Sequence, residues 1–314
     1  MSFNILQFVL GTVLLYYGAD FLITGSKKVA LKYNITPVII GITLVAFGTS
    51  LPELIVSIIA TLKNDSGIVV GNVVGSNIAN IGLVLGITAV FNPIFFSFNK
   101  LRFDLYFLMC ITVCPLLFIY IGDLVFWQGI FFLLLLFGYC WKLIKNKYEY
   151  DEQHGNQNIE GLFLIFVKII LGIVGLGFGA HFFVLGAKGI AFGLGVSSLV
   201  IGMSIVALGT SLPELAASIV AAKHNETGFI FGNIIGSNIM NIIAVLGFTL
   251  LFRPIPVKFP DIAIQGIFMV ILTMGLVILL RYKGGVTKFS AGVFIFIYCL
   301  FLYFNFQYGL RIAL

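Results

Sequence analysis

Long apolar segments alternate with short polar connections along the whole chain. Several contain about 20 residues, the length at which an α-helix crosses the hydrocarbon core of a bilayer. The longest polar stretch, 146–160, has five apolar segments on each side. The pattern predicts an all-α polytopic membrane protein with ten transmembrane helices. The expected spans are 4–26, 36–62, 68–91, 103–121, 125–145, 165–190, 196–222, 229–251, 262–281 and 289–308.

The two halves of the chain repeat each other. Shifting the numbering by 161 maps residues 18–93 onto residues 179–254 without a gap, and roughly half of the positions are identical. Because each half has an odd number of spans, the second copy enters the membrane from the opposite side, which predicts two inverted five-helix repeats. The expected divisions are a first half at 1–145 with its repeat at about 36–91, a linker at 146–160, and a second half at 161–314 with its repeat at about 196–251.

Composition agrees with a membrane protein and indicates its orientation. Hydrophobic residues make up 60% of the chain and charged residues 10%, with a mean hydropathy of +1.13, whereas soluble domains carry about 25% charged residues. With the N-terminus outside, thirteen of the 18 basic residues lie on the inner side. Basic residues favour the cytoplasmic side. We therefore expect a cell-membrane protein with both termini outside and a cytoplasmic linker, and no binding to nucleic acid.

Signals for other chemistry are weak. The four cysteines lie in apolar segments without metal-ligand neighbours, so we expect small core residues at Cys110, Cys114, Cys140 and Cys299. The sequence contains no Gly-x-Ser-x-Gly, no His-Glu-x-x-His and no paired catalytic aspartates. We expect neither an enzyme nor a cofactor.

One phrase occurs in both halves, Gly-Thr-Ser-Leu-Pro-Glu at 48–53 and at 209–214. An acid at membrane depth costs about 3 kcal/mol or more. Pro52 has no N–H for the carbonyl of Gly48, so the helix should break there. Free carbonyls, hydroxyls and a carboxylate are the hard oxygen ligands that Na+ and Ca2+ take. Each phrase therefore predicts half of an intramembrane cation site.

The next span in each half carries a polar stripe at helical spacing. Its members are Asn72, Ser76 and Asn80 in the first half and Asn233, Ser237 and Asn241 in the second. Their oxygens are neutral ligands that complete an ion's shell. Close helix packing is the alternative explanation for the neighbouring glycines and some serines. It does not explain Glu53 and Glu214, since no Lys or Arg lies at their depth. Asp20 and its repeat partner His181 are interpreted as polar residues at a helix end or gate.

These motifs resemble the two alpha-repeats of the sodium/calcium exchanger family. The resemblance rests on the two phrases above with Gly-Asn at 71–72 and 232–233 and Gly-Ser-Asn-Ile-x-Asn at 75–80 and 236–241. It covers nearly the whole chain. It implies that spans one and six slide as a gate across the other eight.

The resemblance also implies ligands for the ions. One sodium site would use the Ala46 carbonyl with Thr49, Ser50, Glu53 and Ser76, and its twin would use Ala207, Thr210, Ser211, Glu214 and Ser237. Calcium would lie between Glu53 and Glu214, helped by Thr49 and Thr210, with Asn80 and Asn241 at a middle position. Well-known members of the family carry Asp where this chain has Asn241, so this site lacks one titratable group.

The expected function is antiport of Na+ against Ca2+ through a shared site. The two carboxylates supply a charge of −2, which one Ca2+ or two Na+ neutralises, so the ions compete. A proton-coupled exchanger of calcium or another cation is the nearest alternative, and a cation channel is a more distant one. The expected partners are the two ions and the lipid bilayer, without an obligate protein partner.

Overall fold

A computed structural model describes residues 2–145, 161–194 and 207–313. Except for two strands of two residues each, the regular elements in these ranges are helices. Eight of them are long and apolar enough to cross a membrane, or nine if the broken helix over Pro37–Thr49 and Leu51–Leu62 is one span. The predicted seventh span, 196–222, lies partly outside the described residues, so the predicted count of ten stays a prediction.

The helices form two compact units. Unit 1 comprises Met1–Ser50 and Cys140–Gly236, and unit 2 comprises Leu51–Tyr139 and Ser237–Leu314. Each unit therefore combines segments from both halves of the sequence. The unit boundaries fall within the helical phrases that carry the candidate ligands, between Ser50 and Leu51 and between Gly236 and Ser237.

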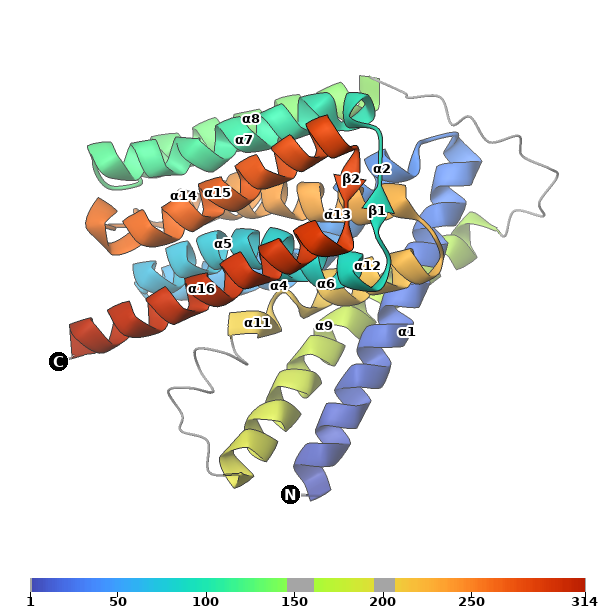
Figure 1. The fold of residues 1–314 in the computed structure, drawn as a ribbon, viewed down its shortest axis with the longest axis horizontal. Helices are drawn as coiled ribbons and strands as arrows, with labels where there is room; N and C mark the ends of the chain where they lie inside the picture. Colours follow the sequence, from blue (N-terminus) through green and yellow to red (C-terminus); the bar gives the residue numbers. More distant parts are fainter. Residues whose placement is uncertain (1, 146–160, 195–206, 314) are drawn as a thin grey trace. The chain divides into compact units, whose positions relative to one another are not determined.

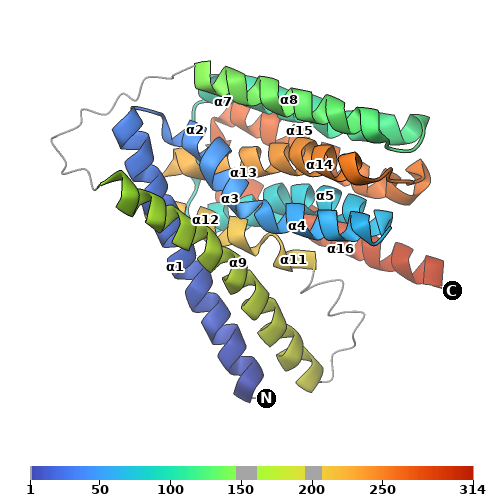
Figure 2. The same ribbon diagram turned by 180° about the vertical axis from the view of Figure 1, so that it is seen from behind.

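Unit 1 is organised around two long helices that lie side by side, α1 (Ser2–Tyr33) and α9 (Leu162–Gly193) (Figures 1 and 2). Glycines allow this close approach, because a Cβ atom at Gly172 would lie 2.6 Å from the backbone nitrogen of Leu22. The other elements of unit 1 are α2 (Pro37–Ile40), η1 (Gly41–Val45), α3 (Ala46–Thr49), α11 (Ala207–Gly209), α12 (Leu212–Lys223) and most of α13 (Thr227–Ile239).

Glycines also pack η1 against α13 within unit 1. A Cβ atom at Gly41 would lie 2.9 Å from the Cα of Gly232, and one at Gly236 would lie 2.6 Å from the Cα of Ile42. The packing interpretation of Gly232 and Gly236 is therefore confirmed. At their repeat counterparts, Gly71 and Gly75, an added Cβ atom would have no described atom within 4 Å.

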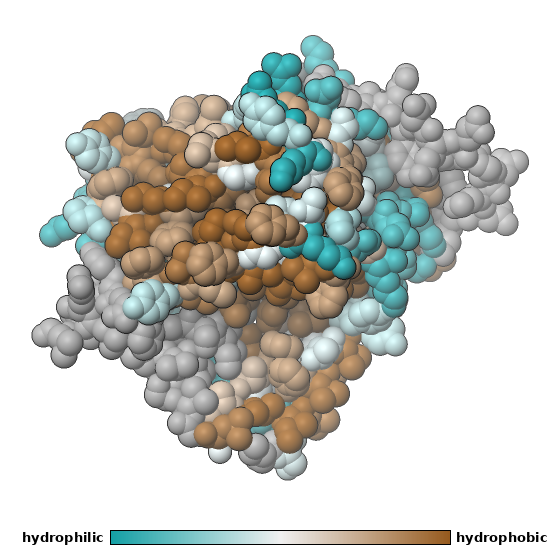
Figure 3. All heavy atoms as spheres, in the orientation of Figure 1, coloured by the Kyte–Doolittle hydropathy of each residue, from teal (hydrophilic) through white to brown (hydrophobic). Residues whose placement is uncertain are grey.

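Unit 2 begins with α4 (Leu51–Leu62), α5 (Ser66–Ala79), η2 (Asn80–Leu85), α6 (Gly86–Phe91), β1 (Ile94–Phe95), α7 (Phe98–Ile121) and most of α8 (Phe126–Lys145). It ends with η4 (Met240–Val245), α14 (Leu246–Phe252), α15 (Phe259–Lys283), β2 (Gly285–Val286) and α16 (Lys288–Ala313). β1 pairs antiparallel with β2, with Ile94 opposite Val286 and Phe95 opposite Gly285 (Figure 1). Figure 3 shows hydrophobic residues over α15 and α16, as expected of helices that face lipid.

Two expectations need correction. α1 continues to Tyr33 instead of ending near residue 26, because a helix continues through lysines whose long side chains reach water. The cysteines are not core residues: Cys110 and Cys299 are exposed, and Cys114 and Cys140 are half-buried. An apolar neighbourhood in the sequence does not separate a core position from a lipid-facing one.

Candidate cation-binding site

The helix breaks at the same point in both repeats. Ser50, between α3 and α4, has φ −85° and ψ 2°, and Ser211, at the start of α12, has φ −87° and ψ 4°. Both conformations lie in the sparsely allowed bridge region between helix and strand. The proline two residues later, Pro52 or Pro213, lacks the N–H that would continue the helix. The predicted break is confirmed in both phrases.

An asparagine fixes the backbone at each glutamate. In unit 2, the Nδ2 of Asn72 donates to the carbonyl of Glu53 at 2.9 Å and to the Oγ of Ser57 at 2.8 Å. Glu53 is 1% exposed. Since a carbonyl and a hydroxyl share one amide donor group, the turn that carries the acid is tied to the neighbouring helix α5.

The second repeat has the same arrangement within unit 1. The Nδ2 of Asn233 donates to the carbonyl of Glu214 at 3.2 Å and to the Oγ of Ser218 at 3.1 Å. Glu214 is fully buried. Sequence reasoning missed Ser57 and Ser218, although each follows its glutamate by four residues, on the same face of the helix.

Hydroxyls of the first repeat contact residues of the second within unit 1. The Oγ of Ser50 donates to the Oε1 of Glu214 at 3.3 Å, and the Oγ1 of Thr49 donates to the Oδ1 of Asn233 at 3.1 Å. The Ala46 carbonyl accepts from the backbone N–H of Ser50 at 3.0 Å. A hydroxyl that donates to a carboxylate keeps lone pairs with which it can bind a cation.

Unit 2 holds the asparagines of the predicted middle position. The Nδ2 of Asn80 donates to the Oδ1 of Asn238 at 3.2 Å. Asn241 is fully buried, and neither its Oδ1 nor its Nδ2 has a hydrogen-bond partner among the described residues. Asn80 begins η2 and Asn241 lies in η4, and such π-helical turns occur often at functional sites.

A family model described as sodium/calcium exchanger protein matches residues 3–145 and 164–307. The chain belongs to the sodium/calcium exchanger family. This exchanger is similar over most of its length to several known proteins, and cation/Ca2+ exchange is the activity that the family supports.

Three relatives match this chain over more than three quarters of its length and of their own. A sodium/calcium exchanger of Methanosarcina acetivorans is 32% identical over 96% of this chain and 98% of its own. An uncharacterized membrane protein of Methanocaldococcus jannaschii is 39% identical over 84% of this chain and 87% of its own. A putative antiporter of Alkalimonas amylolytica is 37% identical over 78% of this chain and 80% of its own.

Solved structures of the sodium-calcium exchanger NCX_Mj have the same fold. The structure soaked with 2.5 mM Na+ and 0.1 mM Ca2+ is 34% identical, with a TM-score of 0.82 over 95% of this chain and 97% of that chain. The structure soaked with zero Na+ and Ca2+ has the same TM-score at 35% identity. The likeness therefore does not depend on the ions in the soak.

The predicted ligands of the exchanger divide between the two units. Unit 1 holds Ala46, Thr49, Ser50, Ala207, Thr210, Ser211 and Glu214, and unit 2 holds Glu53, Ser76, Asn80, Ser237 and Asn241. The Oγ of Ser76 donates to the carbonyl of Asn72 at 2.7 Å, and the Oγ of Ser211 has no described hydrogen-bond partner. The side chain of Ala207 lies outside the described atoms. The ligand set itself stays a prediction.

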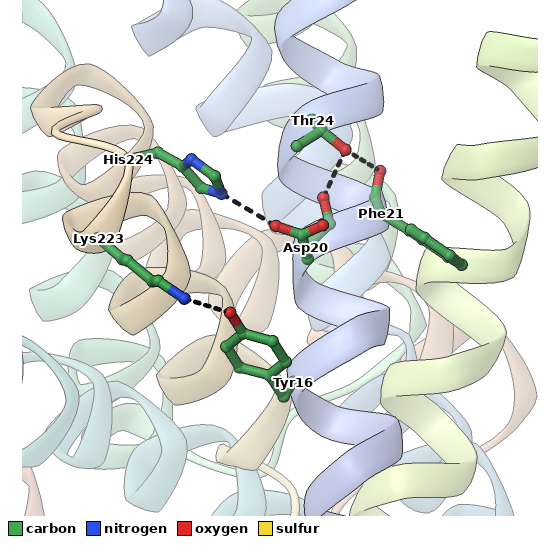
Figure 4. A network of polar contacts seen from close by, with 6 residues as sticks. All are labelled: Tyr16, Asp20, Phe21, Thr24, Lys223 and His224. Atoms are coloured by element: carbon green, nitrogen blue, oxygen red, sulfur yellow. Dashed lines mark hydrogen bonds and ion pairs between the residues drawn. The ribbon is translucent and has the colours of Figure 1, made fainter.

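A second polar cluster joins α1 to the far end of α12 within unit 1 (Figure 4). The Nε2 of His224 lies 2.9 Å from the Oδ1 of Asp20. Lys223 donates to the hydroxyl of Tyr16, and this hydrogen bond raises the pKa of Lys223. Lys27 forms an ion pair with Glu226 at 2.5 Å. The sequence singled out Asp20 but not its partner.

Proposed function

We propose that this exchanger is an Na+/Ca2+ antiporter and that both ions use Glu53 and Glu214. One observation carries the proposal: each repeat holds a buried glutamate whose carbonyl and following serine share one asparagine donor. A buried carboxylate on a backbone that is fixed in this way is a suitable ligand for a dehydrated cation, since the turn that carries it does not have to be reorganised for binding.

Charge balance makes the two ions competitors. Two carboxylates are neutralised by one Ca2+ or by two Na+, whereas two uncompensated charges oppose burial of the site. A site that can be closed only when it is filled exchanges one ion for the other. Ca2+ accepts flexible oxygen coordination, while Mg2+ demands a tight octahedron and sheds water reluctantly, so we expect preference for Ca2+.

The hydroxyls beside the acids support Na+ as the coupled ion. The Ser50 hydroxyl donates a hydrogen bond to the Glu214 carboxylate, and the Thr49 hydroxyl donates one to Asn233, which binds the carbonyl of Glu214. A proton needs one carboxylate oxygen, whereas Na+ needs several oxygens around it. The relative from Methanosarcina acetivorans carries the name sodium/calcium exchanger, which favours the same cation.

The full proposal includes the predicted architecture: two inverted repeats, ten spans, alternating access, and both termini outside. Orientation has a direct test. A single cysteine in place of Gln153, in a background without other cysteines, should react with an impermeant reagent only from the cytoplasmic side. Labelling from outside would overturn the orientation and with it the expected inverted arrangement.

Coupling is tested by uptake of radiolabelled Ca2+ into proteoliposomes. We expect uptake to require an outward Na+ gradient and to be unaffected by an outward proton gradient of equal size. Uptake driven by protons without Na+ would replace the proposal with the proton-coupled alternative. Downhill Ca2+ flux without either gradient would indicate a channel.

A further inference from the structure

A basic surface lies at one end of unit 2, and we call it the arginine surface. The pairing of β1 with β2 and the packing of α7 along α15 place the start of α7 near the end of α15. Figure 3 shows hydrophilic residues near the end of the unit where these strands lie. Its exposed basic side chains are Lys100, Arg102, Arg281, Lys283 and Lys288.

Two of these cations meet on one tyrosine. The guanidinium carbon of Arg102 lies 5.9 Å from the ring centroid of Tyr106, and the Nη1 of Arg281 donates to the hydroxyl of Tyr106 at 3.1 Å. Among the described residues, neither arginine has a carboxylate within 4.0 Å. In unit 1, by contrast, Lys27 is paired with Glu226 and His224 with Asp20. Two like charges on one side chain repel each other, so a bound anion would stabilise the pair.

At this surface, the described residues of α7, α15 and α16 carry no exposed acidic side chain. Asp104, close to Arg102 on α7, is only 4% exposed and accepts a hydrogen bond from the Tyr139 hydroxyl at 2.8 Å. α7 and α16 both begin here without an acid in the first turn. Helix N-termini carry partial positive charge, which adds to that of the side chains.

We propose that the arginine surface binds the phosphate of an anionic phospholipid headgroup. Guanidinium groups bind phosphate oxygens in a bidentate manner, and Tyr106 holds both in place. The lipid assignment follows from the neighbouring aromatic residues: Tyr282 is 76% exposed and Phe289 is 79% exposed. Aromatic side chains of this kind concentrate at the membrane interface, where headgroups lie. The proposal does not depend on which cation drives exchange.

The test measures lipid binding to the purified full chain by native mass spectrometry and by thermal melting. Phosphatidylglycerol should bind and raise the melting temperature, whereas phosphatidylcholine should do so weakly. Each basic residue near an anionic surface contributes about fivefold to affinity, so Arg102→Gln with Arg281→Gln should weaken phosphatidylglycerol binding roughly 30-fold. Arg102→Lys with Arg281→Lys should recover part of the affinity, because the charge remains.

A matched control removes the same charge elsewhere in unit 2. Lys63→Gln with Lys258→Gln should leave phosphatidylglycerol binding unchanged. Equal weakening in this control, equal binding of phosphatidylcholine, or no recovery in the lysine variant would each overturn the proposal. Inorganic phosphate should not displace the lipid; displacement with equal stabilisation would assign the surface to a free anion and overturn the lipid assignment.

Discussion

The two repeats share the contacts that hold the glutamates, yet they differ at the asparagines of the middle position. Asn72 and Asn233 make the same pair of hydrogen bonds, to a glutamate carbonyl and to the serine four residues later. Asn80 donates to Asn238, whereas its counterpart Asn241 has no described hydrogen-bond partner. The hydrogen bonds that hold the backbone at the two glutamates are therefore equivalent in the two repeats, whereas those of the side-chain amides at positions 80 and 241 are not.

The asymmetry extends to the partners of these asparagines. Asn238 accepts from Asn80, while its own counterpart, Asn77, donates to the carbonyl of Val73 at 2.8 Å. Identical residues at equivalent positions therefore have different environments. A buried amide without partners costs free energy, and the amide of Asn241 has none among the described residues. Under the proposed function, an ion bound through its carbonyl oxygen would offset this cost.

The largest expected effect is loss of transport when either acid is neutralised. Glu53→Gln and Glu214→Gln each leave a divalent ion half-compensated in a dry site, which is unfavourable by several kcal/mol. Both variants should reach the membrane and lose Ca2+ uptake driven by Na+. Glu226→Gln is the matched control, since Glu226 pairs with Lys27 and lies outside the candidate site. Near-normal uptake in one of the two variants would show that its glutamate is not required for transport.

The supporting asparagines should give the next largest effect. Asn72→Ala removes the hydrogen bonds to the Glu53 carbonyl and to Ser57. Asn233→Ala removes the two equivalent bonds of the second repeat and also the bond from Thr49. At about 1 kcal/mol per bond, both variants should melt earlier and exchange more slowly, Asn233→Ala more so. Thermal melting and initial rates of Ca2+ uptake measure the two effects. Asn77→Ala, which removes only a bond within its own helix, serves as the control, and an equally large defect there would remove the special role of the two supporting asparagines.

Much of this arrangement could be predicted from the sequence. Among the described residues, hydropathy located eight spans, or nine with the broken helix. The repeated phrase located the acids and the helix breaks, because proline and a buried charge have local consequences. Contacts between distant positions could not be predicted in the same way. The bond from Ser50 to Glu214 joins different repeats, and the pairing of β1 with β2 depends on how α7 and α15 pack. The hydrogen-bond register of η2 and η4 is a backbone property without a residue signature here.

Placing a carboxylate at position 80 or at position 241 should have different effects on the protein. Asn80→Asp replaces the donor to Asn238 with an acceptor, so two acceptors would face each other and the protein should be less stable by about 1–3 kcal/mol. Asn241→Asp breaks no described hydrogen bond, so stability should change less, while added negative charge should alter Ca2+ affinity and ion selectivity. Melting and Na+-driven flux across pH 6 to about pH 9 test both variants. Unchanged flux in Asn241→Asp at every pH would remove residue 241 from the ligand set.

The smallest expected effect concerns the contact between Asp20 and His224, which the repeat does not conserve: the equivalent positions hold His181 and Lys63. The two side chains are 31% and 39% exposed, so solvent screens the pair and its contribution to stability should be about 0.5 kcal/mol. Asp20→Asn should lower the melting temperature slightly, because it removes the charged acceptor that faces the Nε2 of His224. Exchanging the two residues, Asp20→His with His224→Asp, should restore the parent value. A loss that is not restored by the exchange would mean that Asp20 acts through another contact of α1.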